Sequence, residues 1–170
     1  MKINPFRASF RTQFLLGLFA CAALLGYAFH TQLRDVNPLE PCPLCIFQRI
    51  AFFALGIVFL LGALHGPTRA VWRRAYGVLA LIAAGAGILV AGRHVWITHL
   101  PADQVPSCGA PFEFMRQTMG PLRLIQKVMT GSGECAKIDW TFLGLSMPAW
   151  SLLWLIALAA WAGYAAFRKR

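Results

Sequence analysis

Charged side chains are scarce in this sequence. They make up 13% of its 170 residues, whereas 58% of the residues are hydrophobic. Ordinary globular domains carry about 25% charged residues. A soluble domain of this length could not bury so much apolar surface, so the composition excludes an ordinary soluble protein. It favours a protein that crosses a membrane several times, with one domain over residues 1–170.

Long apolar runs occur at about residues 12–29, 46–64, 76–95 and 149–167. Each is close to the length of about 20 residues that a helix needs to cross a bilayer. Each should be a helix, because a segment in lipid must satisfy its own backbone hydrogen bonds. Glycine, alanine and serine recur within the runs and favour close helix packing. The first run is long and no A-x-A cleavage site separates it from Cys42, so we expect a span and not a cleaved signal peptide. The predicted fold is an all-α, four-helix membrane bundle.

Acidic residues are missing from one set of the segments that join these runs. The two termini and the link between the second and third runs hold nine basic residues and no acid: Lys2, Arg7, Arg11, Arg69, Arg73, Arg74, Arg168, Lys169 and Arg170. All six acids lie in the other two segments, about 30–45 and 97–148. The positive-inside rule therefore predicts cytoplasmic termini and two outer loops. Because topology explains the basic clusters, the net charge of +10 gives no reason to expect a nucleic-acid partner.

Cysteines are few, but this topology sorts them by compartment. Cys21 lies inside the first run, where we expect an ordinary core residue. The other four, Cys42, Cys45, Cys108 and Cys135, fall on the outer side. Disulfides persist in oxidising compartments, so these four thiols are candidates for redox chemistry.

The second outer loop is long for so compact a chain, and long loops are usually functional. Its middle part places apolar residues at helix-like spacing: Phe112, Met115, Met119, Leu122, Ile125 and Met129. The basic residues Arg116, Arg123 and Lys127 fall between them. This pattern predicts a short amphipathic helix, broken near Gly120–Pro121, that lies on the membrane surface. The alternative is a small cap that packs on itself.

The stretch PCPLCIFQR, residues 41–49, combines a thiol pair with a permanent charge. Pro43 suits the first position of a helix, which makes Cys42 the predicted N-cap and puts Cys45 in the first turn. A helix N-terminus favours a thiolate. Arg49 follows Cys45 by four residues and shares its helix face. A charge so close to the membrane should have a partner, either a thiolate or the oxygen of a bound acceptor; the alternative is a snorkelling anchor.

Motifs for tightly bound redox groups are missing: the chain has no CxxCH haem attachment, flavin fingerprint or metal cluster. Two thiol pairs on one side can exchange through a mixed disulfide. Electrons that reach the helix pair must then leave, and a lipid-soluble quinone is the simplest acceptor. A static structural bridge is an alternative. A zinc site that also uses Cys108 and Cys135 is another. We expect no metal, because zinc sites usually combine two close pairs of ligands and 26 residues separate Cys108 from Cys135.

Two motifs resemble the family of bacterial disulfide bond formation protein B, the DsbB thiol oxidases of the inner membrane. PCPLCIFQR is similar to the family pattern P-C-x-L-C-x-x-x-R, and GLSMPAW at residues 144–150 resembles G-L-x-M-P-x-W. The resemblance covers nearly the whole chain. It implies a multi-pass protein-disulfide:quinone oxidoreductase of the bacterial inner membrane, with its active cysteines on the periplasmic side, that sustains disulfide formation in periplasmic proteins.

The resemblance also implies roles for single residues. A Cys108–Cys135 disulfide would oxidise a periplasmic DsbA-like partner, and Cys135 would then pair with Cys42. Cys45 would be left as a thiolate beside ubiquinone or menaquinone, supported by Arg49.

The family has a quinone-contacting histidine near the outer end of the third span. His94 is the nearest candidate for it, and His99 competes. Pro43 replaces a more usual apolar residue between the cysteines, which could alter the redox potential of the pair.

Three alternatives compete with this function. Vitamin K epoxide reductases also combine four spans with a CxxC and loop cysteines, but their CxxC follows the loop pair, whereas here it comes first. A metal-binding membrane protein could use the four thiols as ligands. A structural membrane subunit could hold static disulfides.

Overall fold

Four long helices form the body of the molecule: α1 (Phe10–Leu33), α2 (Pro43–His65), α3 (Ala70–Thr98) and α7 (Met147–Phe167). The computed structural model describes residues 8–33, 41–101, 103–105, 112–138 and 140–168. All four helices are long and apolar enough to cross a membrane, which confirms the four-span, all-α prediction. Each extends beyond its predicted run at one or both ends, because hydropathy detects the apolar middle of a helix and not its capped ends.

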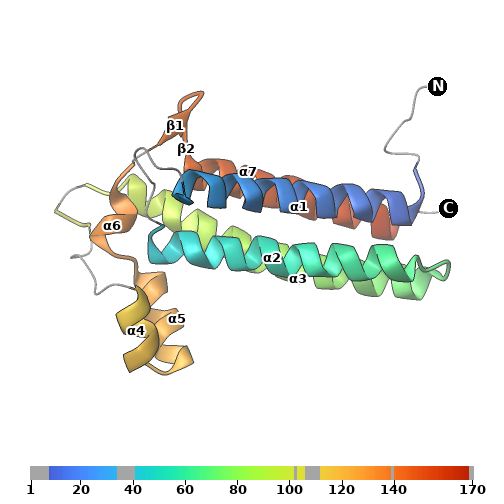
Figure 1. Ribbon diagram of the computed structural model, residues 1–170, viewed down its shortest axis with the longest axis horizontal. Helices are drawn as coiled ribbons and strands as arrows, with labels where there is room; N and C mark the ends of the chain where they lie inside the picture. The colour runs from blue at the N-terminus through green and yellow to red at the C-terminus, as the bar shows by residue number, and fades with distance from the viewer. Residues whose placement is uncertain (1–7, 34–40, 102, 106–111, 139, 169–170) are drawn as a thin grey trace.

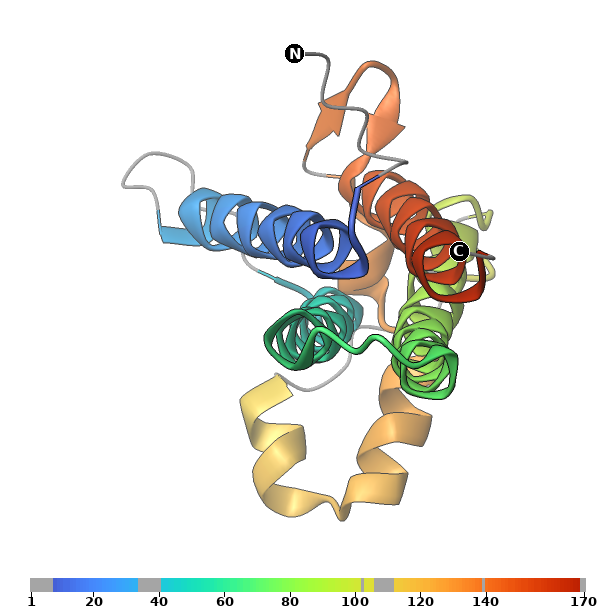
Figure 2. The ribbon, with the colours of Figure 1, turned by 90° about the vertical axis from the view of Figure 1, so that its right-hand side faces the viewer.

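The four helices stand side by side around a common core (Figures 1 and 2). α3 packs against α2 and α7, and α1 packs against α2. Small residues let the helices approach closely, as predicted. A β-carbon on Gly17 would lie 2.7 Å from the Phe59 ring, and one on Gly87 would lie 2.9 Å from both Ala51 and Leu155. Any larger side chain at these two positions would therefore separate the helices.

Buried and exposed apolar residues divide as expected for a bundle in lipid. Phe14, Leu55 and Phe59 are fully buried in the core. Cys21 is also buried and belongs to the same cluster, which confirms that it is a core residue. By contrast Phe19 is 74% exposed on the outer surface of α1. Large exposed apolar side chains are costly in water but suit a lipid-facing surface.

The two ends of the bundle differ in content. α1 begins, α7 ends and α2 turns into α3 at one end (Figure 1). Cys42, Cys45 and Cys135 lie at the other, which we call the cysteine end. This grouping is the one that the charge pattern predicted. Which end faces the cytoplasm stays a prediction.

Three short helices and a hairpin lie at the cysteine end. They are α4 (Phe112–Thr118), α5 (Pro121–Thr130), α6 (Gly133–Ala136), β1 (Thr141–Phe142) and β2 (Leu145–Ser146). The predicted amphipathic helix is thus two helices, and the break lies at the predicted Gly120–Pro121. Val128 is buried against the bundle, whereas Leu122 remains 82% exposed. Contact of this exposed side with a membrane surface stays a prediction.

The antiparallel hairpin of β1 and β2 was not predicted from the sequence. Its two-residue turn has Leu143 at φ 51° and Gly144 at φ 78°. Such turns need positive φ at both positions, which suits Gly144 but is unusual for Leu143. The Trp150 indole donates to the Phe142 carbonyl at 3.0 Å and so ties the hairpin to the first turn of α7.

Candidate active site

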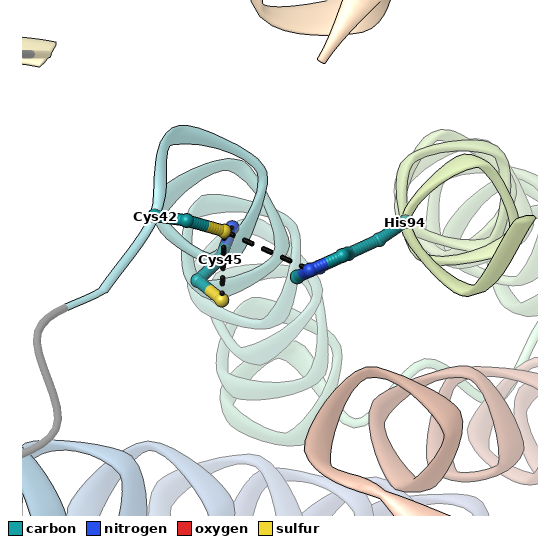
Figure 3. Close-up of side chains that lie close together, drawn as sticks. All are labelled: Cys42, Cys45 and His94. Carbon is teal, nitrogen blue, oxygen red and sulfur yellow. Dashed lines mark hydrogen bonds between the residues drawn. The ribbon is translucent and has the colours of Figure 1, made fainter. Parts of the chain in front are cut away.

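The thiol pair lies at the first turn of α2, as predicted. Cys42 is the N-cap with φ −65° and ψ 163°, and Pro43 begins the helix. The Cys42 sulfur accepts a hydrogen bond from the Cys45 backbone N–H at 3.4 Å. The two Sγ atoms are 3.2 Å apart, and both cysteines carry free thiols (Figure 3). This distance places the pair ready to form a bond with little movement of the backbone.

His94 reaches across from α3 to the Cys42 sulfur (Figure 3). Its side chain is only 3% exposed. Nε2 lies 3.7 Å from Cys42 Sγ and 3.1 Å from the Cys135 carbonyl oxygen, while Nδ1 lies 2.9 Å from the Gln48 amide nitrogen. A carbonyl can only accept, so Nε2 carries the proton and Nδ1 accepts from Gln48.

His99, the competing histidine, lies elsewhere. It is the C-cap of α3, its side chain is exposed, and Nδ1 lies 2.8 Å from the Val95 carbonyl. Of the two histidines, only His94 therefore contacts the thiol pair.

Cys135 approaches Cys42 from the loop. It is 1% exposed and packs with Cys42, Leu44 and Ile97. A hydrogen bond with Cys42 and burial raise the pKa of the Cys135 thiol well above its usual value. In the reduced protein Cys135 therefore stays protonated at neutral pH, and the part of this shift that comes from the Cys42 thiol is absent when Cys42 is in a disulfide. The predicted partner of Cys135, Cys108, lies outside the described residues.

An apolar cavity of about 500 Å³ opens on the other side of the pair, beside Cys45. Pockets for small molecules usually measure about 300–1,000 Å³. Aromatic side chains form much of the wall: Tyr27, Phe52, Trp140, Phe142, Trp150 and Trp154. The polar side chains on the wall are few: Thr31, Cys45, Gln48, Arg49 and Ser151. Cys45 and Arg49 share this wall, as their four-residue spacing predicted, whereas His94 does not line it.

The partners of Arg49 differ from those expected. The guanidinium donates to the Gln32 side-chain oxygen and, at 3.1 Å, to the Ala28 carbonyl. It also lies 5.2 Å from the centre of the Phe29 ring. All three partners belong to α1, whereas we anticipated a thiolate or the oxygen of a bound acceptor. The charge is thus held at the cavity wall by neutral groups, which leaves it available to a polar ligand.

Three metal-binding side chains meet at the same place. The ligand atoms of Cys42, Cys45 and His94 all lie within 4.8 Å of one another. The metal-binding alternative requires such an arrangement. Nε2 of His94, however, is hydrogen-bonded to the Cys135 carbonyl, so a metal would have to break that contact.

Two residues of this region were missed at the level of sequence. Gln48 bonds to His94, and Arg93 donates to the carbonyls of Met129 at 3.0 Å and Thr130 at 3.1 Å. The partners of Arg93 lie far away in the chain, so no local spacing could reveal them. Gln48 had one usable signal, because it lies four residues after Leu44 on the buried side of α2.

Known proteins resemble the chain over almost its full length. The family model described as Disulfide bond formation protein DsbB matches residues 10–165. A protein of Xanthomonas axonopodis pv. citri named Disulfide bond formation protein B is 59% identical over 168 residues, which cover 99% of this chain and 96% of that protein. One of the same name from Xanthomonas campestris pv. campestris strain 8004 has the same identity and coverage. Another from Xylella fastidiosa strain 9a5c is 49% identical, over 92% of this chain and 90% of its own length.

Proposed function

The chain belongs to the DsbB family of disulfide bond formation proteins, and on this premise we propose that it reoxidises a periplasmic DsbA-like dithiol protein and passes the electrons to a membrane quinone. One observation carries the proposal: the Cys42–Cys45 pair lies between a loop cysteine and an apolar cavity. Cys135 packs against Cys42, and Cys45 lines the cavity. The pair can therefore exchange with a protein on one side and with a lipid-soluble molecule on the other.

The loop side performs thiol–disulfide exchange. A Cys108–Cys135 disulfide accepts two electrons from the reduced partner, whose two thiols become a disulfide. Cys135 then bonds to Cys42, which breaks the Cys42–Cys45 disulfide and releases the Cys45 sulfur as the leaving group. The net change so far is one disulfide lost from this chain and one gained by the partner. The packing of Cys135 against Cys42 supports this order of events.

The cavity side fits a quinone. Its size and aromatic wall suit a flat apolar ring, and the Arg49 guanidinium and the Cys45 sulfur offer polar contacts at one edge. A bound quinone accepts two electrons and two protons. The chain itself holds the released Cys45 sulfur on the cavity wall, aims a permanent positive charge into the same space and excludes water with aromatic side chains. Cys108 then displaces Cys42 from Cys135, and the Cys42 and Cys45 thiols give two electrons and two protons to the quinone, so that both disulfides of the chain are restored.

Purified protein in detergent tests the function directly. Reduced DsbA-like partner and ubiquinone-1 or a short-chain menaquinone are added, and the loss of quinone absorbance is followed beside the loss of partner thiols. We expect one quinone reduced for each disulfide formed. Partner oxidation without quinone reduction would contradict the proposal.

The metal-binding alternative has its own readout. Metal analysis of anaerobically purified protein should find less than stoichiometric zinc or copper. One tightly bound ion for each chain, lost in Cys42→Ser and His94→Ala, would favour that alternative.

A further inference from the structure

Two neighbouring residues of α3 contact the backbone of the loop that carries Cys135. Arg93 donates from Nε to the Met129 carbonyl and from Nη2 to the Thr130 carbonyl. These carbonyls belong to the last turn of α5, where a helix has unpaired acceptors and partial negative charge. The fork of a guanidinium matches two adjacent carbonyls, and a single lysine ammonium does not.

His94 contacts the other end of the same loop segment. Its Nε2–H donates to the Cys135 carbonyl, and Gln48 fixes that tautomer by bonding to Nδ1. Gln48 in turn lies on α2, one turn after Cys45. The imidazole thus joins the backbone of the loop cysteine to the helix that carries the thiol pair.

Between the Arg93 and His94 contacts, the backbone of the loop runs close to α3. Gly131 has φ 83°, a backbone conformation that favours glycine, and a β-carbon there would displace the end of the Ile97 side chain. The Cys135 N–H then donates to the Ser132 carbonyl at 2.9 Å, which forms the turn of α6. In Figure 1 this turn lies over the cysteine end of the bundle, next to the first turn of α2.

We propose that Arg93 and His94 form a backbone latch that holds residues 129–135 on α3 and thereby positions Cys135 for exchange with Cys42. The inference rests on the proposed function and deepens it: Arg93 is a positioning residue for the exchange between the two thiol pairs, with no part in quinone binding. All three contacts go to backbone carbonyls, so none of them involves the Cys135 sulfur.

The latch raises the effective concentration of the Cys135 thiol beside the Cys42 thiol. When two groups are tethered in one chain, a contact that restricts the tether toward the reacting geometry favours bond formation between them. The Cys42–Cys135 disulfide should therefore be more stable with the latch than without it.

A redox equilibrium without quinone or partner protein measures this effect. The Cys21→Ala/Cys45→Ser/Cys108→Ser protein retains only Cys42 and Cys135. Glutathione disulfide oxidises these two thiols to one disulfide and is itself reduced to two molecules of glutathione. Acid quenching, alkylation and mass spectrometry then give the equilibrium constant. We expect Arg93→Met to lower this constant about tenfold, which corresponds to about 1.4 kcal/mol. His94→Ala should lower it as well, and Arg93→Lys should lower it less than Arg93→Met.

Two controls separate positioning from damage. Arg123→Met removes the same charge from the exposed side of α5 and should leave the constant unchanged. In Cys108→Ser/Cys135→Ser protein, Arg93→Met should also leave the Cys42–Cys45 equilibrium unchanged. The latch is refuted if Arg93→Met has no effect on the Cys42–Cys135 constant, if Arg123→Met has an equal effect, or if both disulfides weaken together. Failure of the proposed function would appear separately, as an absence of quinone reduction in the unmodified chain.

Discussion

The two sulfurs of the Cys42–Cys45 pair are 3.2 Å apart, yet they face different surroundings. Cys42 lies in a buried cluster with Leu44 and Ile97, with the His94 imidazole at 3.7 Å and Cys135 packed beside it. Cys45 faces an apolar cavity with an aromatic wall and one guanidinium. The first environment suits exchange with a protein thiol, and the second suits an apolar oxidant.

This difference shows how a helix N-terminus can separate two reactions. Cys42 is the N-cap and Cys45 lies in the first turn, so their side chains leave the helix in different directions. The α3 side of α2 then offers His94, and the α1 and α7 side offers the cavity. The account predicts that substitutions on one side leave the reaction on the other side intact.

The largest effect should come from Cys45→Ser. We expect it to abolish quinone reduction by the reduced partner, because the sulfur that faces the cavity is gone. The Cys42–Cys135 disulfide should still form and accumulate, as non-reducing peptide mapping would reveal. Cys21→Ala is the control and should retain activity, since Cys21 is buried in the core of the bundle. Quinone turnover that persists in Cys45→Ser would remove Cys45 from its assigned place.

The next largest effect should come from Arg49→Met. Hydrogen bonds to charged groups contribute about 1.5–3 kcal/mol, so the KM for quinone should rise roughly 10- to 100-fold. The KM for the partner protein should stay the same, because Arg49 faces the cavity and not the loop. Steady-state kinetics with each substrate varied in turn provides the measurement. The KM for quinone of Arg49→Lys should lie between those of the unmodified protein and Arg49→Met, since lysine keeps the charge but loses the paired N–H donors of the guanidinium. An unchanged KM for quinone would exclude the role.

A smaller effect is expected from filling the cavity. Ser151 lines it from α7, and Ser151→Phe should raise the KM for quinone about tenfold, or about 1.4 kcal/mol, within the usual range for overpacking. Leu153→Phe is the matched control, because Leu153 is 47% exposed on the same helix and does not line the cavity. If the two variants behaved alike, the cavity would not be the quinone site. The Cys42–Cys135 equilibrium should be the same in both.

The smallest effect concerns the loop side and pH. Contact with Cys42 and burial raise the pKa of Cys135, whereas an ordinary cysteine titrates near 8.5. In the reduced protein the alkylation rate of Cys135 should therefore reach its midpoint at a higher pH than that of a free cysteine. Cys42→Ala should move the midpoint down, toward the ordinary value. Mass spectrometry of the Cys135 peptide after timed iodoacetamide treatment gives both midpoints, and equal midpoints would contradict the contact.

The same shift has a consequence for stability. A raised pKa means that the folded chain holds its proton more tightly than the unfolded chain. This contribution to the free energy of unfolding is fully present below the ordinary cysteine pKa of about 8.5, and it is lost as the pH rises toward the folded value. The reduced protein should accordingly lose stability in alkaline solution, and Cys42→Ala should lose less.

The sequence predicted the four long helices, the start of α2 and the shared position of Cys45 and Arg49, because each of these features has a local cause in the sequence. Apolar runs long enough for a bilayer located the four helices. Pro43 and Cys42 located the start of α2, because N1 proline and an N-cap leave a direct mark in the sequence. The spacing of Cys45 and Arg49 placed both on one wall for the same reason.

Features that depend on distant segments could not be predicted in this way. Arg93 looked like a charge at a helix end, and only the fold brings it to the carbonyls of Met129 and Thr130. The hairpin has strands of two residues and Leu143 at positive φ, so it carries no alternating pattern and an unfavourable turn residue. Arg49 was expected to need a partner, but the sequence could not show that its partners lie on α1, because the packing of α1 against α2 decides which groups it meets.

The most direct test asks which sulfur of the pair bonds to Cys135. Two proteins are compared in glutathione buffer, both with Cys21→Ala and Cys108→Ser. One also has Cys45→Ser and retains Cys42 with Cys135, and the other has Cys42→Ser and retains Cys45 with Cys135. The account predicts a much larger equilibrium constant for the Cys42–Cys135 disulfide. An equal or larger constant for Cys45–Cys135 would contradict the division of the pair into a loop side and a cavity side.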